Sequence, residues 1–516
     1  MRKIEIKTSS DIEFSRDYSF EYFNKSIQRF DLISSLMSMQ KISALICNQT
    51  AVNLNLEFEF YNTPKIKKRL GMLTKDFIAF TAKQVLINCE KSELKFNDLD
   101  LANTVYSYGN LEIDLHKTGD GEKTDGNEWL WLIRTANHQW PYLRFHSSII
   151  GRYYWIFSKI FEKNGQFGKI LDQTLGMAIF DAMKIGTCIC SNYYPRENEK
   201  FATSFLMESY TNAPISISKT LLTEKNILKF FDIFAINQEK FKEEFKKFEI
   251  TDHLLKKYEF NPLKRFPVIK TDSDKKNEQY IIPSLPDFLY GVFEGLYYVL
   301  LDKLNSDNKK ILFREIGSIF ESYVGELIKE YNIDILSRAT LLPEITYVLG
   351  SERKSADWLL VSDEYIFQIE CKKRKINNYA KAGIQSEDGK GIISLLSEIA
   401  TEIDKMIEKE DHIKCNKING IAYKGQKIIN LIVFLDEMFC MNQYARKEIK
   451  KLMKSQNNNF NILGCWELEL ICQQSKNKQQ NLYNSIQDLL TGRTEIYSVD
   501  FLDRVYHDFF DQLLKE

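Results

Sequence analysis

The clearest pattern of hydrophobic and polar positions in this chain is a pair of short apolar runs joined by a polar corner. Residues 358–361 and 365–371 are rich in aliphatic and aromatic side chains, as β-strands are. Ser362, Asp363 and Glu364 separate the two runs. The pattern therefore predicts a β-hairpin.

A two-residue turn fixes the register of this hairpin. It sets Ser362 opposite Tyr365 and Asp357 opposite Glu370. Because side chains alternate along a strand, Glu370 and Lys372 share one face. Directly opposed residues have Cβ atoms roughly 4.5–5.5 Å apart. The sequence thus predicts two carboxylates and an ammonium group on one small patch.

The residues around the hairpin predict a mixed sheet flanked by helices. Apolar residues recur at helical spacing in three segments and form strand-like runs in three others. The expected helices are 311–331, 392–407 and 482–490, and the expected strands are 341–349, 428–435 and 461–466. The continuous apolar run 428–435 is typical of a strand buried on both faces.

The first 262 residues predict a mainly α-helical domain, with helices within 18–47 and up to about residue 249 and a strand at 54–60. Four prolines follow between residues 262 and 286, around an expected hairpin of 268–270 with 280–282. We place the boundary here. The expected domains are 1–262, for recognition, regulation or assembly, and 263–516.

Composition narrows the class of protein. The chain has 516 residues with Lys+Arg 70 and Asp+Glu 71, so any binding of nucleic acid needs a local basic surface. No apolar run is long enough for a membrane span, and the first residues lack the apolar segment of a signal peptide. The 9 cysteines and 6 histidines are scattered, which disfavours zinc sites and disulfides. We expect a soluble cytoplasmic protein.

The triplet Glu370-Cys371-Lys372 carries little information alone, because Glu-x-Lys recurs elsewhere, for example at residues 93–95 and 448–450. Only the copy at residues 370–372 lies at the end of an apolar strand. The strand before it is itself preceded by an aspartate, Asp357. Charged side chains in such a place are paired or bind metal.

Asp357, Glu370 and Lys372, preceded by Glu321 on a predicted helix, resemble the PD-(D/E)XK nuclease superfamily. The resemblance covers residues 312–490. It implies an α/β restriction-endonuclease-like core, with a mixed sheet flanked by helices, after the large mainly helical N-terminal region. One departure is alanine, not proline, immediately before the aspartate.

The resemblance also implies a Mg²⁺-dependent nuclease, with Mn²⁺ as a substitute. Asp357, Glu370 and the backbone carbonyl of Cys371 would hold the metal, and Glu321 would ligate a second metal or a metal-bound water. Lys372 would orient or activate the attacking water.

Nucleic acid is the partner that this resemblance implies, DNA in preference to RNA. Candidate contacts to its phosphates follow the strand and are Lys373, Arg374, Lys375, Lys381 and Gln385. Proteins of this superfamily with large helical additions include DNA repair nucleases, restriction enzymes and bacterial antiphage effectors. A role in restriction or antiviral defence is thus one that the resemblance allows, and DNA repair is another.

Other interpretations stay open. In the first alternative, Asp357 and Lys372 form only a cross-strand ion pair, and Glu321 is an ordinary residue at a helix edge. The chain would then be a catalytically silent scaffold or a nucleic-acid-binding subunit of a larger complex. The near-zero net charge also favours a homodimer or a partner subunit that completes the active surface. Aromatic residues near Arg134, Arg144, Arg152 and His146 either stack on bases or pack in the core.

Overall fold

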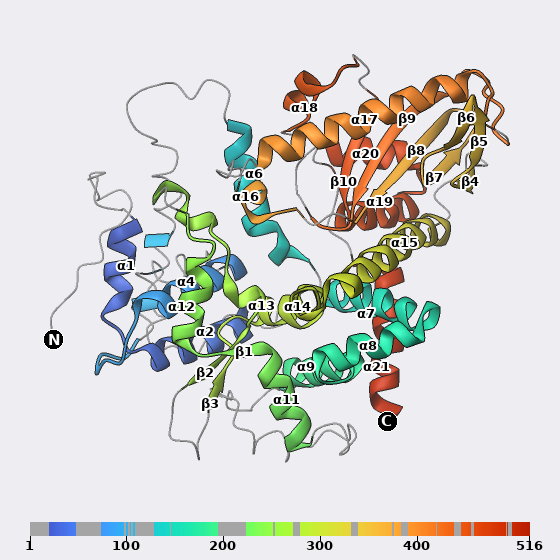
Figure 1. Cartoon of the computed structure of the whole chain (residues 1–516). Coiled ribbons are helices and arrows are strands. Elements are labelled where there is room, and N and C mark those ends of the chain that lie inside the picture. The colour runs from blue at the N-terminus through green and yellow to red at the C-terminus, as the bar shows by residue number, and fades with distance from the viewer. Residues whose placement is uncertain are drawn as a thin grey trace, which may run out of the picture. The chain divides into compact units, whose positions relative to one another are not determined.

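The computed structural model describes most of the chain (Figure 1). The residues it describes are 20–47, 74–96, 100–101, 104, 107–108, 128–144, 146–193, 223–250, 253–271, 279–331, 339–373, 376–382, 391–418, 420–437, 445–455, 459–491, 493 and 498–515. The expected strand at 54–60 lies outside these residues. No helix in the described part is long and apolar enough to cross a membrane.

The chain divides into two compact units that interleave along the sequence. The first comprises Met1–Lys123, Ile185–Pro214 and Leu222–Val292, and the second comprises Thr124–Lys184, Ile215–Leu221 and Phe293–Glu516. The division therefore differs from the single boundary expected near residue 262. Helices of the segment 124–184 belong with the C-terminal sheet, and the hairpin after residue 262 belongs with the N-terminal helices.

The first unit is mainly helical around one small sheet. Two helices form within 18–47 as predicted, α1 (Phe20–Gln28) and α2 (Leu32–Cys47), and α4 (Lys75–Asn88), α11 (Glu224–Phe234) and α12 (Gln238–Lys246) follow. The sheet has the order β1 (Ala235–Ile236), β2 (Val268–Thr271), β3 (Gln279–Ile281). The predicted hairpin is confirmed, since β2 and β3 pair antiparallel. Phe23, Phe77, Phe241 and Ile269 lie in its core.

The second unit is built around a five-stranded mixed sheet of order β10-β9-β8-β7-β4. The strands are β4 (Thr340–Pro343), β7 (Trp358–Val361), β8 (Tyr365–Lys372), β9 (Lys427–Phe434) and β10 (Phe460–Gly464). β8, β9 and β10 run parallel, while β7 and β4 are antiparallel to their neighbours. All but the first residue of β9 are buried, as the apolar run predicted.

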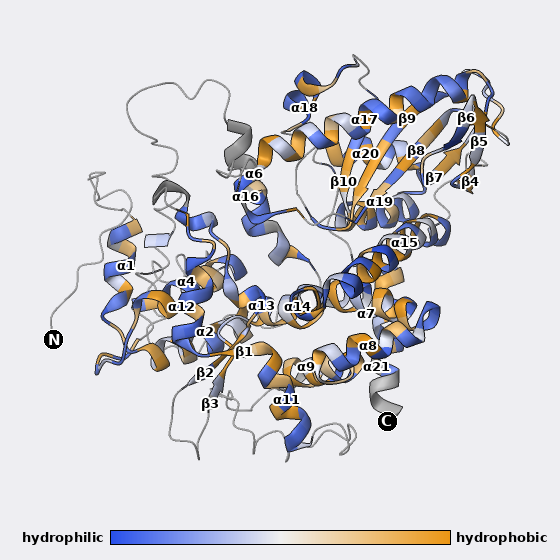
Figure 2. Ribbon diagram, in the orientation of Figure 1, coloured by the Kyte–Doolittle hydropathy of each residue, from blue (hydrophilic) through white to orange (hydrophobic). Residues whose placement is uncertain are grey.

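Helices cover both faces of this sheet. α17 (Ile392–Lys414) packs on the face that carries Ile432 and Phe434 of β9. α15 (Ser306–Glu330) and α19 (Cys465–Lys478) lie on the opposite face (Figure 1). The strands are hydrophobic because both of their faces are covered (Figure 2). The fold class of this unit is therefore α/β, with a mixed sheet flanked by helices.

Further helices complete the second unit. They are α6 (Glu128–Gln139), α7 (His146–Lys163), α8 (Gly165–Leu175), α14 (Gly295–Lys303), α16 (Asn378–Lys381), α18 (Arg446–Leu452), α20 (Leu482–Leu490) and α21 (Asp500–Lys515). α9 (Ile179–Tyr193) spans a boundary between the units. The predicted bounds of α20 are confirmed.

Two strand predictions need correction. The single strand expected at 341–349 is two strands in different sheets, because the chain turns at Glu344 and β5 (Thr346–Leu349) pairs with β6 (Ser351–Lys354). The strand expected at 461–466 ends at Gly464, where α19 begins. Eleven consecutive residues of α19, from 465 to 475, are buried, so it lacks the polar stripe by which a surface helix is recognised.

Buried charges hold α7 to the rest of the second unit. Arg152 donates from Nε and Nη2 to both carboxylate oxygens of Glu469, at 2.7 and 2.6 Å, and from Nη1 to Glu437 at 3.0 Å. Arg144 pairs with Glu294 at 3.0 Å. Arg144 is 3% and Arg152 is 1% exposed, and the neighbouring aromatic residues Tyr142, Tyr153 and Trp155 are buried too, which agrees with packing in the core.

Candidate active site

The predicted register of the central hairpin is confirmed. Trp358 pairs with Ile369 and Val361 with Ile366, so Asp357 falls opposite Glu370 one step beyond the strand. The Ser362 amide donates to the Tyr365 carbonyl at 2.9 Å and closes the turn.

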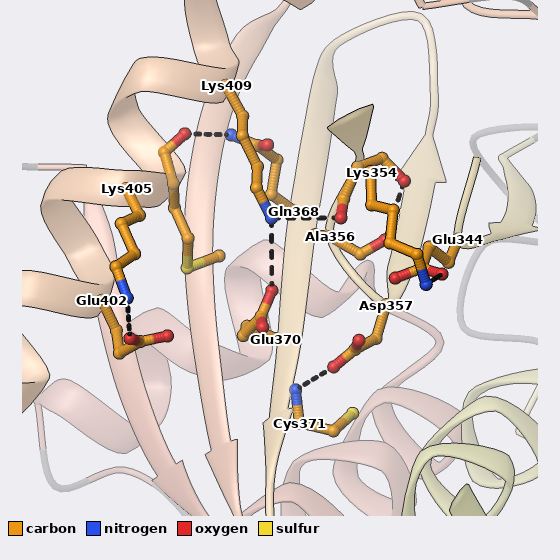
Figure 3. Close-up of polar contacts among 12 residues, drawn as sticks. Glu344, Lys354, Ala356, Asp357, Gln368, Glu370, Cys371, Glu402, Lys405 and Lys409 are labelled. Carbon is orange, nitrogen blue, oxygen red and sulfur yellow. Dashed lines mark hydrogen bonds and ion pairs between the residues drawn. The ribbon is translucent and has the colours of Figure 1, made fainter. Parts of the chain in front are cut away.

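Asp357 lies at the end of the ladder between β7 and β8 (Figure 3). Its Oδ2 accepts a hydrogen bond from the Cys371 amide at 2.7 Å. Glu370 is the residue of β8 immediately before Cys371, and it is half-buried. The Cys371 side chain is buried, as its position on the other face predicted. The hairpin therefore brings the two predicted carboxylates together.

Glu321 reaches the same region from α15. The Trp358 indole donates from Nε1 to the Glu321 carbonyl at 2.8 Å, which fixes this turn of α15 against β7. Gly325, one turn later, permits the close approach, because a Cβ there would lie 2.2 Å from Trp358 Cζ2.

Burial and the negative charges of neighbouring carboxylates raise the pKa values of Asp357 and Glu321. Burial, and next the negative charge of Glu370, raise the pKa of Asp357 to about 7, with a smaller effect of Glu321 and an opposing effect of the Cys371 amide. Burial, followed by Glu344 and Glu370, also raises the pKa of Glu321. Both Asp357 and Glu321 therefore hold a proton more readily than an exposed carboxyl does.

Lys372 lies on the α17 face of the sheet with Glu370, as alternation predicted. Its Nζ lies 3.0 Å from Glu370 Oε1 and 2.6 Å from Glu402 Oε2. Burial acts to lower the pKa of Lys372, but the two carboxylates outweigh it and raise the pKa above its ordinary value. Lys372 therefore stays charged at neutral pH, and no ion pair between it and Asp357 is observed.

Two residues of α17 complete this arrangement and were not predicted. Lys409 Nζ lies 3.7 Å from Glu370 Oε2 and donates to the Ser355 carbonyl at 3.1 Å (Figure 3). Glu402 also accepts from Lys405 at 2.7 Å. The available signal was spacing: residues 402 and 409 lie two turns apart on one helix face, next to the apolar stripe that packs on the sheet.

The predicted substrate contacts fall into two groups. Lys373 donates to the Phe313 carbonyl of α15, and Lys381 pairs with Asp436 at 2.6 Å. Both amines thus have partners within the protein. Arg374, Lys375 and Gln385 lie outside the described residues.

The donor set of the site matches a hard divalent cation. Carboxylate and peptide oxygens are the ligands that Mg²⁺ prefers. Asp357, Glu370 and the Cys371 carbonyl are adjacent in the hairpin, and Glu321 faces them from α15. In this structure the carboxylates are turned toward lysines and an amide, and among the described residues no three acidic, His or Cys side chains form a compact metal-binding group.

Comparison with protein-family models, curated proteins and solved structures finds no match to this chain. The case for a function therefore depends on the residues of the site.

Proposed function

We propose that this protein is a metal-dependent nuclease with a restriction-endonuclease-like core in its second unit. The observation that carries the proposal is the hairpin register, which sets Asp357 opposite Glu370 with Lys372 on the face of Glu370. A helix supplies a third carboxylate, Glu321, beside them. Charged groups at a strand end inside a covered sheet need a chemical reason, and phosphodiester hydrolysis provides one.

Each residue has a distinct role in such a reaction. Asp357 and Glu370, with the Cys371 carbonyl, would hold Mg²⁺, which lowers the pKa of a bound water and neutralises charge on the phosphate. Lys372 orients the attacking water and stabilises negative charge that develops on the phosphate oxygens. Glu321 would ligate a second metal or a metal-bound water, as the resemblance implies.

DNA is the substrate we propose, on the strength of the family resemblance. A restriction or antiviral defence effector is the setting that the same resemblance favours, in the cytoplasm. The first unit would then serve recognition, regulation or assembly, with a second copy or a partner subunit.

A catalytically silent scaffold is the second candidate. The observation in its favour is that Glu370 is paired with Lys372 and Lys409, at 3.0 and 3.7 Å. Two carboxylates and a lysine at the end of the hairpin, with Glu321 on α15 nearby, argue for the enzyme, because a scaffold has no use for the repulsion between the carboxylates.

The test is a substrate panel. Purified protein is incubated with plasmid DNA, linear duplex DNA, single-stranded DNA and RNA, each with Mg²⁺, Mn²⁺ or EDTA. We expect cleavage of DNA with either metal, none with EDTA, and none by Glu370→Gln. Cleavage that persists unchanged in Glu370→Gln is contamination and refutes the proposal, as does a wild type that is inactive on all four substrates.

A further inference from the structure

A cavity of about 290 Å³ opens beside Lys372, on the α17 face of the sheet. Its walls come from the carboxyl ends of β8 and β9 and from α17. Ligands in α/β folds commonly bind in the crevice outside the carboxyl ends of parallel strands. This cavity occupies such a place, and it shares Lys372 with the proposed catalytic site.

The lining of the cavity is apolar within and polar at the rim. Leu395, Ile432 and Phe434 line it and are buried. Ser397 and Thr401 contribute exposed hydroxyl groups from α17. An apolar interior with a few polar groups at its rim is typical of a site for a flat, partly polar ring.

The charges around the cavity indicate which part of a nucleotide it can hold, the phosphate or the base. The rim carries the carboxylates of Glu398 and Glu402, which repel a phosphate, so the uncharged base is the part of a nucleotide that fits the cavity. Lys372, which also lines the cavity, is the cation that faces the scissile phosphate in the proposed function. A phosphate at Lys372 therefore leaves its attached base next to the cavity.

Size limits the occupant further. Small-molecule sites occupy roughly 300–1,000 Å³, so a cavity of about 290 Å³ is at the lower end of that range and suits a ligand as small as a single base. A base can enter only when it is unpaired, either in a single strand or turned out of a duplex.

We infer that this cavity binds one unpaired nucleobase next to the bond that is cut. The inference rests on the proposed function for the identity of the neighbouring phosphate. It makes the substrate a single-stranded DNA segment or a duplex with an unpaired nucleotide.

The experiment uses 2-aminopurine, whose fluorescence rises when it leaves its stacked neighbours. Full-length protein is mixed in EDTA with a short single-stranded DNA oligonucleotide that carries the probe, and with the same strand in a duplex. Thr401→Trp fills the mouth of the cavity, and Glu408→Trp adds the same side chain at an exposed position two turns further along α17. Ser397→Phe is a second filling variant, and thermal unfolding confirms that all variants fold.

We expect a fluorescence rise with wild type and Glu408→Trp on the single strand, a smaller one on the duplex, and about a tenfold loss of affinity in both filling variants, as for the loss of one base-stacking contact. No rise with wild type, or equal rises in the filling variants, overturns the inference. If the fluorescence rises with wild type, is lost in the filling variants, and no cleavage occurs in Mg²⁺ or Mn²⁺, the base site is supported and the nuclease is refuted. If the protein cleaves DNA but the fluorescence does not rise, the nuclease is supported and the base site is refuted.

Discussion

The amino group of Lys372 lies 2.6 Å from the carboxylate of Glu402 on α17, and this ion pair fixes the direction in which the proposed catalytic lysine points. Glu402 is itself held by Lys405 at 2.7 Å. α17, which contributes none of Asp357, Glu370 and Lys372, therefore positions the amino group of Lys372 that orients water.

Glu402→Gln removes this charge and keeps the shape of the side chain. We expect kcat to fall by about 10- to 100-fold, because small displacements of a catalytic group are costly, while KM changes little. Glu408→Gln, exposed on the same helix, is the matched control and should keep the wild-type rate. A rise in KM at constant kcat would show that Glu402 acts on substrate binding instead.

Added Mg²⁺ should stabilise the protein against heat. At about 100 times its dissociation constant, a ligand that binds only the folded state adds roughly 2.7 kcal/mol to the free energy of unfolding. Asp357→Asn should abolish this gain, whereas Asp363→Asn, at the exposed turn of the same hairpin, should preserve it. The melting temperature of each variant is measured with and without Mg²⁺. An equal rise with Mg²⁺ in both variants contradicts the assignment of Asp357 as a metal ligand.

Gly325 should tolerate no side chain. A Cβ would lie 2.2 Å from Trp358 Cζ2, so Gly325→Ala pushes α15, which carries Glu321, away from β7. We expect a loss of about 1–3 kcal/mol in the free energy of unfolding, as for other overpacked cores, together with weaker cleavage. Glu326→Ala, at the exposed neighbouring position, should change neither quantity. Denaturant unfolding curves of both variants decide the point.

The buried network around Arg152 should make stability depend on pH. Two arginines, Arg144 and Arg152, face three carboxylates, Glu294, Glu437 and Glu469, so one negative charge is in excess. Burial raises the pKa of Glu437 to about 7, although Arg152 and Arg144 oppose the rise.

Because the folded-state pKa of Glu437 lies above its unfolded value, the stability it contributes is full below about pH 4.5 and is lost as pH rises through about 7. Glu437→Gln removes that loss. Chemical denaturation should therefore find the variant about 1–3 kcal/mol more stable than wild type at pH 8, with the difference much smaller at pH 5. An equal difference at both values would show that Glu437 does not change its charge in this range.

The hairpin could be predicted from sequence because its determinants are local. The turn length and the alternation of residues 358–371 set the register without help from the rest of the fold. The same holds for α20, whose apolar stripe is short and regular.

The partners of the site could not be predicted, because they come from distant segments. In the sequence, Glu402 and Lys409 look like ordinary helix residues. Their role becomes visible only in the structure, where α17 packs against the sheet beside β8. Arg152 meets Glu469 across 317 residues of sequence. α19 was missed because burial on all sides removes the amphipathic pattern, and its start directly after β10 extends the apolar run of the strand.

The central claim is that Lys372 and its carboxylates cut phosphodiester bonds. Single-turnover cleavage of DNA in Mg²⁺ by wild type, Lys372→Ala and Lys451→Ala tests it most directly, since Lys451 is an exposed lysine of α18 that pairs only with its helix neighbour Glu448 among the described residues. The account predicts metal-dependent cleavage by wild type and Lys451→Ala, and a rate about 10²- to 10⁴-fold lower for Lys372→Ala. Equal rates for all three proteins, or cleavage that continues in EDTA, would contradict it.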